Sequence, residues 1–227
     1  MNFPILSTLI FLPLLSSFFI FLSKTQKNNS GNIYISLFSS LATLALSLFL
    51  WHSIDLNSPD FQFVEEQSWI NDFIKFKLGV DGISILFIVL TTFITPICII
   101  SCINSVKYRV KEFLIAILVL ETFMIGVFCS LDLVIFYLFF EAGLIPMFLI
   151  IGVWGGSKRV YSAFKFFLFT LLGSVLMLVA IIVIYWLTGT TDITQIYEIK
   201  IPDEYQNLLW LAFLSSFAVK IPMWPVH

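Results

Sequence analysis

The sequence predicts an all-α membrane protein, a polytopic bundle of about seven transmembrane helices. Hydrophobic residues make up 59% of the 227 residues and charged residues only 11%, and the mean hydropathy is +1.02. Soluble domains carry about 25% charged residues. A soluble fold of this length has too much surface for its volume to hide so many apolar side chains. The apolar residues are also grouped into runs long enough to cross a bilayer.

The apolar runs have the length of spanning helices, which need about 20 mostly apolar residues. The first is long enough to span a membrane, so it is interpreted as a retained helix rather than a cleaved signal peptide. No repeat or linker divides the chain, which predicts a single transmembrane domain over residues 1–227. The predicted helices cover 4–22, 33–52, 79–103, 112–130, 132–152, 161–187 and 208–227.

The connections between the runs differ in charge, and this predicts the orientation. Lys and Arg favour the cytoplasmic side of a membrane. The alternate connections, which follow the second, fourth and sixth runs, hold few basic residues among many acidic ones. The N-terminus is therefore expected on the outer side. The connections after the first, third and fifth runs carry Lys24, Lys27, Lys107, Arg109, Lys111, Lys158 and Arg159.

The connection before the third run has some structure of its own. Residues 61–78 fit either a short interfacial helix or a strand, and either would lie at the outer interface, where Trp is favoured. Asp81 follows in LGVDGIS and is predicted to cap the next helix.

Several classes of function are disfavoured by the sequence. A net charge of −2 gives no sign of nucleic-acid binding. Cys98 and Cys102 lie four apart on one helical face but lack the partners of a metal site, and we expect them to be inert. No nucleotide loop, haem pair or nucleophile–base arrangement is present. We therefore expect no metal, no cofactor and no covalent chemistry in this chain.

Glu141 is the most unusual residue of the sequence. It lies near the middle of the 132–152 run, roughly 14 Å from the outer end. An ionisable side chain near the bilayer centre costs roughly 3 kcal/mol. No charged residue lies within eight positions of it, and its side chain is too short to reach the interface. A structural contact between helices is the alternative, but isolated carboxylates in membranes usually mark ion paths.

Lys220 lies at a similar depth, near 18 Å from the outer end of the last run. Both runs are predicted to cross from outside to inside, so the two side chains are able to face each other. Snorkelling to the interface is the alternative for a lysine. Prolines favour the functional interpretation, because a proline lacks an amide hydrogen and frees a carbonyl one turn earlier. Pro222 and Pro225 would free the carbonyls of Ala218 and Ile221, and Pro146 that of Ala142, beside Glu141.

Two further charges lie inside predicted helices. Glu121, in the middle of the 112–130 run, fits a second residue of an ion path and a contact between helices equally well. Lys165 lies near the inner end of the 161–187 run, where snorkelling explains it, and a relay role is the alternative.

A buried acid–base pair suits proton movement. Burial disfavours the charged form of a lysine, while a nearby carboxylate stabilises it. Moving or protonating the carboxylate would make the lysine release its proton. We hypothesise that Glu141 tunes Lys220 and that Lys220 carries the proton.

Five segments resemble one known family: FQFVEEQSWI, KLGVDGIS, LDLVIFYLFFEAGLIPMFLIIGVWGG, RVYSAFKFFLFTLLGSVLML and FAVKIPMWPVH. Together they are similar to the subunit M, or chain 4, family of proton-pumping NADH:quinone oxidoreductase, respiratory complex I. The resemblance covers about residue 61 to the end, and the first sixty residues match in hydropathy.

The resemblance implies an antiporter-like fold of inverted five-helix repeats. It also implies a functional glutamate on the fifth helix and a lysine on a broken seventh helix, which fall on Glu141 and Lys220. Such a subunit translocates protons beside other membrane subunits of the complex, especially neighbouring antiporter-like ones. NADH, FMN, iron–sulfur clusters and quinone belong to other subunits.

The family's chains continue past MWPVH into a second repeat. We therefore expect this chain to be the N-terminal half of a longer protein, or one product of a split gene, that needs a complementing piece. Two other functions stay open: a subunit of a multi-subunit cation/proton antiporter, and an inert membrane scaffold. The expected location is an energy-transducing inner membrane, with a bacterial one favoured over a mitochondrial one.

Overall fold

The structure is a computed structural model that describes residues 4–23, 30–55, 58–70 and 74–224. Within these residues, six helical segments are long and apolar enough to cross a membrane. The chain is therefore a multi-pass membrane protein of mainly helical fold, and the predicted fold class is confirmed. The six segments are α1 (Ile5–Leu22), α2 (Ser30–Ser53), α3 (Ser84–Ser105), α4 (Val110–Cys129), α5 (Leu133–Ala142) continued by α6 (Leu144–Trp154), and α7 (Arg159–Thr188).

The last long helix, α9 (Asp203–Lys220), is not among the six segments that are long and apolar enough to cross a membrane. It begins five residues before the predicted 208–227 run, because Asp203 and Glu204 occupy its first turn, where carboxylates favour the positive end of the helix dipole. It ends at Lys220, and the backbone turns away at Ile221. The prolines that follow cannot supply the amide hydrogens that a longer helix would need.

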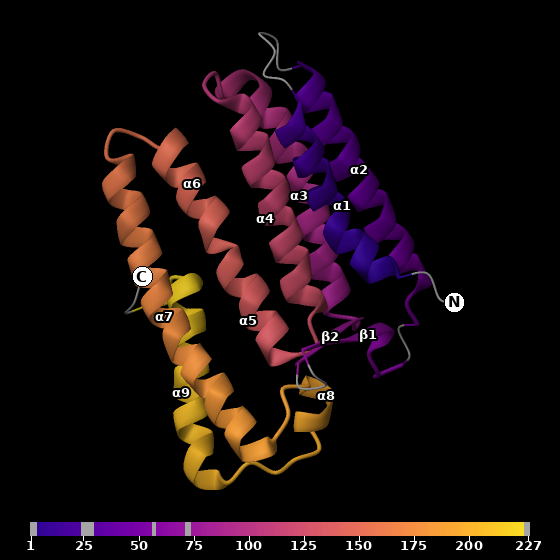
Figure 1. Ribbon diagram of the computed structural model, residues 1–227, viewed down its shortest axis with the longest axis vertical. Helices are drawn as coiled ribbons and strands as arrows, with labels where there is room; N and C mark the ends of the chain where they lie inside the picture. Colours follow the sequence, from indigo (N-terminus) through magenta and orange to yellow (C-terminus); the bar gives the residue numbers. More distant parts are fainter. Residues whose placement is uncertain (1–3, 24–29, 56–57, 71–73, 225–227) are drawn as a thin grey trace.

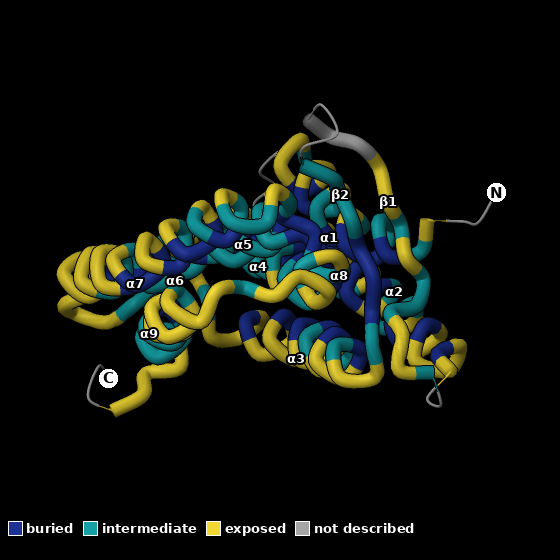
Figure 2. Tube along the Cα trace, turned by 90° about the horizontal axis from the view of Figure 1, so that it is seen from below, coloured by how far each residue is buried: buried dark blue, intermediate teal, exposed yellow. Residues whose placement is uncertain are grey.

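The helices form two groups that meet at α4 and α5 (Figure 1). In the first group α1 packs against α4, and α2 against α3; in the second, α7 packs against α6 and α9. Only 22% to 44% of each spanning window is buried inside the chain. Figure 2 shows exposed residues along the outer faces of α3, α7 and α9. These apolar faces are available to lipid or to other membrane proteins.

The described residues of the 61–78 connection form a strand pair, which decides between the two predicted structures. β1 (Gln62–Ile70) pairs antiparallel with β2 (Ile74–Val80). Because β2 extends to Val80, α3 begins five residues later than the predicted 79–103 helix. Asp81 accepts hydrogen bonds from the amides of Ile83 (3.2 Å) and Ser84 (2.7 Å), so it binds the start of α3, but the N-cap position itself is Ile83 and not Asp81 as predicted.

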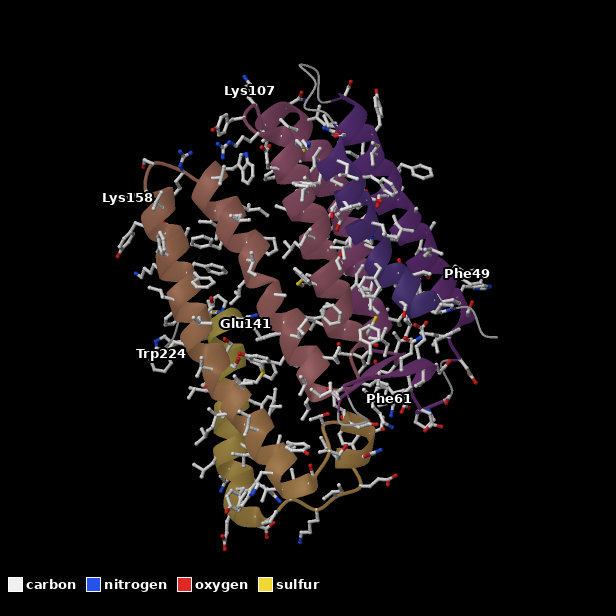
Figure 3. All side chains as sticks on the ribbon, viewed as in Figure 1. Phe49, Phe61, Lys107, Glu141, Lys158 and Trp224 are labelled. Carbon is white, nitrogen blue, oxygen red and sulfur yellow. The ribbon has the colours of Figure 1, made fainter. Side chains whose placement is uncertain are left out.

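The hairpin is tied to the rest of the fold at one end of the bundle. The Leu131 amide donates to the Lys77 carbonyl, and the Leu131 carbonyl accepts from Ile193 at the start of α8 (Ile193–Ile196), both at 2.9 Å. In Figure 3, Phe61 marks this end, and Lys107 and Lys158 lie at the opposite one. The basic connections of the described chain therefore share one end of the molecule.

Candidate functional site

The helix that carries Glu141, α5, is fixed at its start by an N-cap residue. Asp132 caps this helix by accepting hydrogen bonds from the amides of Val134 (2.9 Å) and Ile135 (3.2 Å). Glu141 lies eight residues after the first residue of α5, roughly 12 Å along the axis. α5 ends one residue later, at Ala142, and the C-cap residue Gly143 lies three residues before Pro146. Pro146 has no amide hydrogen to give to the Ala142 carbonyl, so regular helical bonding stops beside Glu141.

Glu141 is half-buried, but its two carboxylate oxygens are fully buried and have no hydrogen-bond partner among the described residues. Figure 3 places it midway along the bundle, where α5 passes α7 and α9. Buried polar groups are nearly always hydrogen-bonded, and the exceptions need an explanation. A bound proton, water or a partner outside this chain would each provide one.

Lys220, in the last turn of α9, is seated directly on α5. Its Nζ donates a 2.7 Å hydrogen bond to the Phe140 carbonyl and lies 3.2 Å from the centre of the Phe140 ring. The charge of Glu141, the next residue, acts on the ammonium. The structure therefore brings the two predicted residues together. They form no ion pair, since the described ion pairs within 4.0 Å are Lys75–Glu66 and Lys77–Asp192.

Polar side chains that sequence reasoning missed line the same junction. Tyr137, one turn before Glu141 on α5, interacts with the Glu141 charge and with the Ser174 hydroxyl of α7. Ser216 lies one turn before Lys220 on the same face of α9, and its buried hydroxyl has no partner among the described residues. Each is an uncharged hydroxyl residue in an apolar run, and such residues are too common in membrane helices to mark a site from the sequence.

The prolines after Lys220 act differently from the prediction. The Ala218 carbonyl, expected to be free, accepts a 2.8 Å hydrogen bond from the Met223 amide. The chain turns tightly enough at Ile221 for the residue after Pro222 to supply the missing donor. Pro225, and with it the fate of the Ile221 carbonyl, lies outside the described residues.

The two secondary candidates lie elsewhere. Glu121 is only 2% exposed, and its Oε1 accepts a 3.3 Å hydrogen bond from the Thr43 hydroxyl of α2. It belongs to the first helix group rather than to the α5–α7–α9 junction. Lys165 is exposed on α7, within about 9 Å of the start of that helix. The structure does not bring it to Glu141.

A second polar cluster lies outside the spanning segments, at the hairpin end. Lys77 of β2 donates to Asp192 at 2.7 Å, and Thr191 donates to Asp132 at 2.5 Å. Burial raises the pKa of Asp132, against the opposing effect of its hydrogen bonds from Thr191 and two amides. For Asp192, burial also acts to raise the pKa, but the hydrogen bonds from Lys77 and Thr194 outweigh it, and the pKa is lowered. This cluster fixes the start of the helix that carries Glu141.

Residues 130–227 match the family model described as NADH:quinone oxidoreductase/Mrp antiporter, TM. The chain is 55% identical over 207 residues to NADH-quinone oxidoreductase subunit M of Rhodobacter capsulatus, covering 86% of this chain and 40% of that protein. It is 49% identical over 224 residues to NADH-ubiquinone oxidoreductase chain 4 of Marchantia polymorpha, covering 98% of this chain and 45% of that protein. The chain thus spans about half the length of the curated relatives that it matches.

Solved structures agree with these relatives. A chain of respiratory complex I from Thermus thermophilus with bound NADH superposes with a TM-score of 0.84 and 26% identity, over 98% of this chain and 45% of that one. A chain of the membrane-bound sulfane sulfur reductase, an archaeal respiratory membrane complex, shares the fold with a TM-score of 0.81. This chain therefore has the antiporter-like membrane fold, and over about half of their length it is a relative of the subunit M and chain 4 proteins of NADH:quinone oxidoreductase.

Proposed function

We propose that this chain forms part of a membrane subunit of a proton-translocating NADH:quinone oxidoreductase, in which Glu141 and Lys220 move protons. One observation supports this proposal above the others. A lysine ammonium lies beside a buried carboxylate that has no hydrogen-bond partner among the described residues, at a place where two helices are interrupted. Groups of this kind inside a membrane mark ion and proton paths by default.

The contacts of Lys220 suit a proton that is held and then released. A carbonyl and an aromatic face stabilise the ammonium, but neither carries a full negative charge. The remaining stabilisation comes from Glu141. While Glu141 is ionised, Coulomb attraction keeps the proton on Lys220. When Glu141 takes up a proton or moves away, burial favours the neutral amine, and Lys220 gives its proton to the next acceptor.

The chain's own part in this function is non-redox. NADH oxidation, FMN, the iron–sulfur clusters and quinone reduction belong to other subunits in this proposal, and the neighbouring antiporter-like subunits are the direct membrane partners. The proposed location is the bacterial inner membrane or its mitochondrial counterpart, with the N-terminus on the outer side. The charge pattern supports this orientation, because Lys107 and Lys158 lie at one end and the hairpin at the other (Figure 3).

Lys220→Arg and Glu141→Gln test the proposal in membranes that contain the assembled complex. Arginine keeps the positive charge and can bind the Phe140 carbonyl, but it does not deprotonate in proteins. We expect both variants to oxidise NADH while pumping falls to the level of uncoupled membranes, measured with a pH-sensitive dye. Glu198→Gln and Lys200→Ala, both exposed in the connection before α9, should pump normally. Full pumping in Lys220→Arg would falsify the proton-carrying role.

A cation/proton antiporter is the second candidate, because the matching family description includes Mrp antiporters. The two functions predict different partners. Purification of this chain together with NADH:quinone reductase activity supports the first function. Sodium/proton exchange in vesicles that do not oxidise NADH supports the second. A scaffold without transport predicts that Glu141 and Lys220 can be replaced without effect on either activity.

A further inference from the structure

A half-open cavity of about 510 Å³, with a mainly apolar lining, lies along α3 and α4 and reaches Ile150 of α6, away from the α5–α7–α9 junction. One water takes up about 30 Å³ in the liquid, so the space is large enough for several waters. It follows α3 from Thr91 to Val106, roughly 22 Å along the helix axis. Val106 lies next to Lys107, so the cavity ends at the basic end of the molecule. Glu121 of α4 is the one carboxylate among its lining residues.

Glu121 is incompletely hydrogen-bonded on the side of this cavity, where the Thr95 hydroxyl acts on its carboxylate but already donates to the Thr91 carbonyl. Its Oε1 accepts a long hydrogen bond from Thr43, whose hydroxyl also points to the Ser39 and Ser40 carbonyls. Its Oε2 is fully buried and has no hydrogen-bond partner in the part of the chain that the structure describes. An unpaired buried carboxyl oxygen is costly unless a proton or a water satisfies it.

The wall formed by α3 carries polar side chains at steps of three and four residues, which places them on one helical face. Four of them already donate to carbonyls of their own helix. A hydroxyl that donates in this way can still accept from water. The wall therefore accepts hydrogen bonds but offers few, which suits water that delivers protons. The polar side chains are Thr91, Thr95, Cys98, Ser101, Cys102 and Ser105.

We propose that this cavity is a hydrated proton-access site, open toward the Lys107 end, in which Glu121 takes up and returns protons. The site lies on a different helix pair from Glu141 and Lys220. Its use in pumping rests on the proposed function, but its hydration and the exchange of protons at Glu121 do not. A lipid acyl chain or a helix of a neighbouring subunit would fill the same space without exchanging protons.

The chain carries its own probes for this test. Cys98 and Cys102 line the cavity, and Cys129 is buried in the core between the hairpin, α4 and α5. In membranes with the assembled wild-type complex, a charged, water-soluble methanethiosulfonate is added on the Lys107 side. Mass spectrometry should find Cys102, which is 3% exposed, modified while Cys129 stays free. Modification of Cys102 by lipid-soluble N-ethylmaleimide alone would overturn the proposal, because it would show a lipid-filled or helix-filled space.

A second measurement follows the proton itself. Dicyclohexylcarbodiimide reacts with protonated carboxyl groups in apolar surroundings. We expect it to modify Glu121 less as the pH on the Lys107 side rises, with no change when only the opposite side is titrated. Modification that ignores both compartments would refute proton access through this cavity. Both measurements use the wild-type chain and do not depend on pumping. Their outcome is therefore independent of the Lys220→Arg test of the proposed function.

Discussion

At the scale of single residues, two adjacent glutamates of the hairpin show how position decides the effect of a charge. Glu65 accepts hydrogen bonds from the amides of Leu6 (2.7 Å) and Ser7 (3.0 Å) at the start of α1, and from the Ser7 hydroxyl. It thus caps a helix that has no side-chain cap of its own. Glu66 pairs with Lys75 at the surface, where their side chains are 41% and 35% exposed.

Glu65→Ala should lower the free energy of unfolding by about 1–2 kcal/mol, because it removes a cap and a favourable charge at the positive end of α1. Glu66→Ala should change it by less than about 1 kcal/mol, since exposed ion pairs contribute little. Thermal unfolding of the two variants in the same detergent compares them directly. Equal losses would show that the hairpin does not cap α1.

Asp192 gives the hairpin end a dependence on pH. Its pKa is lowered because hydrogen bonds from Lys77 and Thr194 outweigh the effect of burial. A lowered pKa means that the folded state prefers the ionised form. The stabilisation is therefore present above the unfolded value of about 3.9 and is lost as the pH falls through it toward the folded value. The midpoint of thermal unfolding should fall below about pH 4 more steeply in the wild type than in Asp192→Asn, and parallel curves would contradict this.

Sequence reasoning found Glu141 and Lys220 and their approach to each other, but not the other groups that hold them. Glu141 and Lys220 stand out because an apolar run makes any charge conspicuous. The polar cluster at the hairpin end could not be predicted, because its members are 55 or more positions apart in the sequence and charged residues are common in polar connections. These members are Lys77, Asp132 and Asp192. Only the fold brings them together. The Phe140 carbonyl, which binds Lys220, has no side-chain signal at all.

At the scale of elements, hydropathy predicted where helices run but not where they change. The centres of the first six runs fall within the observed helices. The observed boundaries differ from the predicted ones for two reasons. Residues 79–80 pair with β1 as part of β2, and a local break at Gly143 divides one apolar run into two helices. The contact between α4 and α5 is another feature that no run reveals. It depends on Gly126, against which the Phe139 ring packs.

Gly126→Ala tests this contact. A Cβ at this position would lie 2.6 Å from atoms of the Phe139 ring, so either the ring or α5 must shift. Such overpacking costs about 1–3 kcal/mol, against a gain of up to about 1 kcal/mol in helix propensity. Gly152→Ala in α6 is the matched control, since its Cβ would meet Ala163 at an ordinary 3.5 Å. We expect the first variant to melt lower than wild type and the control not to; stabilisation by both would show that α5 packs loosely on α4.

At the scale of the whole molecule, the larger part of the core is separate from the two residues proposed to move protons. The first helix group and the hairpin contribute most of the main core cluster, while the second group carries Glu141 and Lys220 and leaves α9 largely exposed (Figure 2). The Asp132–Asp192 cluster joins the two groups at the hairpin end.

The orientation of the molecule gives the last prediction. The charge bias predicts that the hairpin lies outside and the connection between α6 and α7 inside. Gly82 and Gly156 lie in these two regions, and a Cβ at either position would meet nothing within 4 Å, so cysteine fits at both. A membrane-impermeant maleimide added to the outer face of sealed membranes should label Gly82→Cys only, and permeabilisation should add Gly156→Cys. The reverse labelling pattern would show that the predicted topology is inverted, with the hairpin on the inner side of the membrane. Because both glycines are free of contacts, a failure to fold would not explain either outcome.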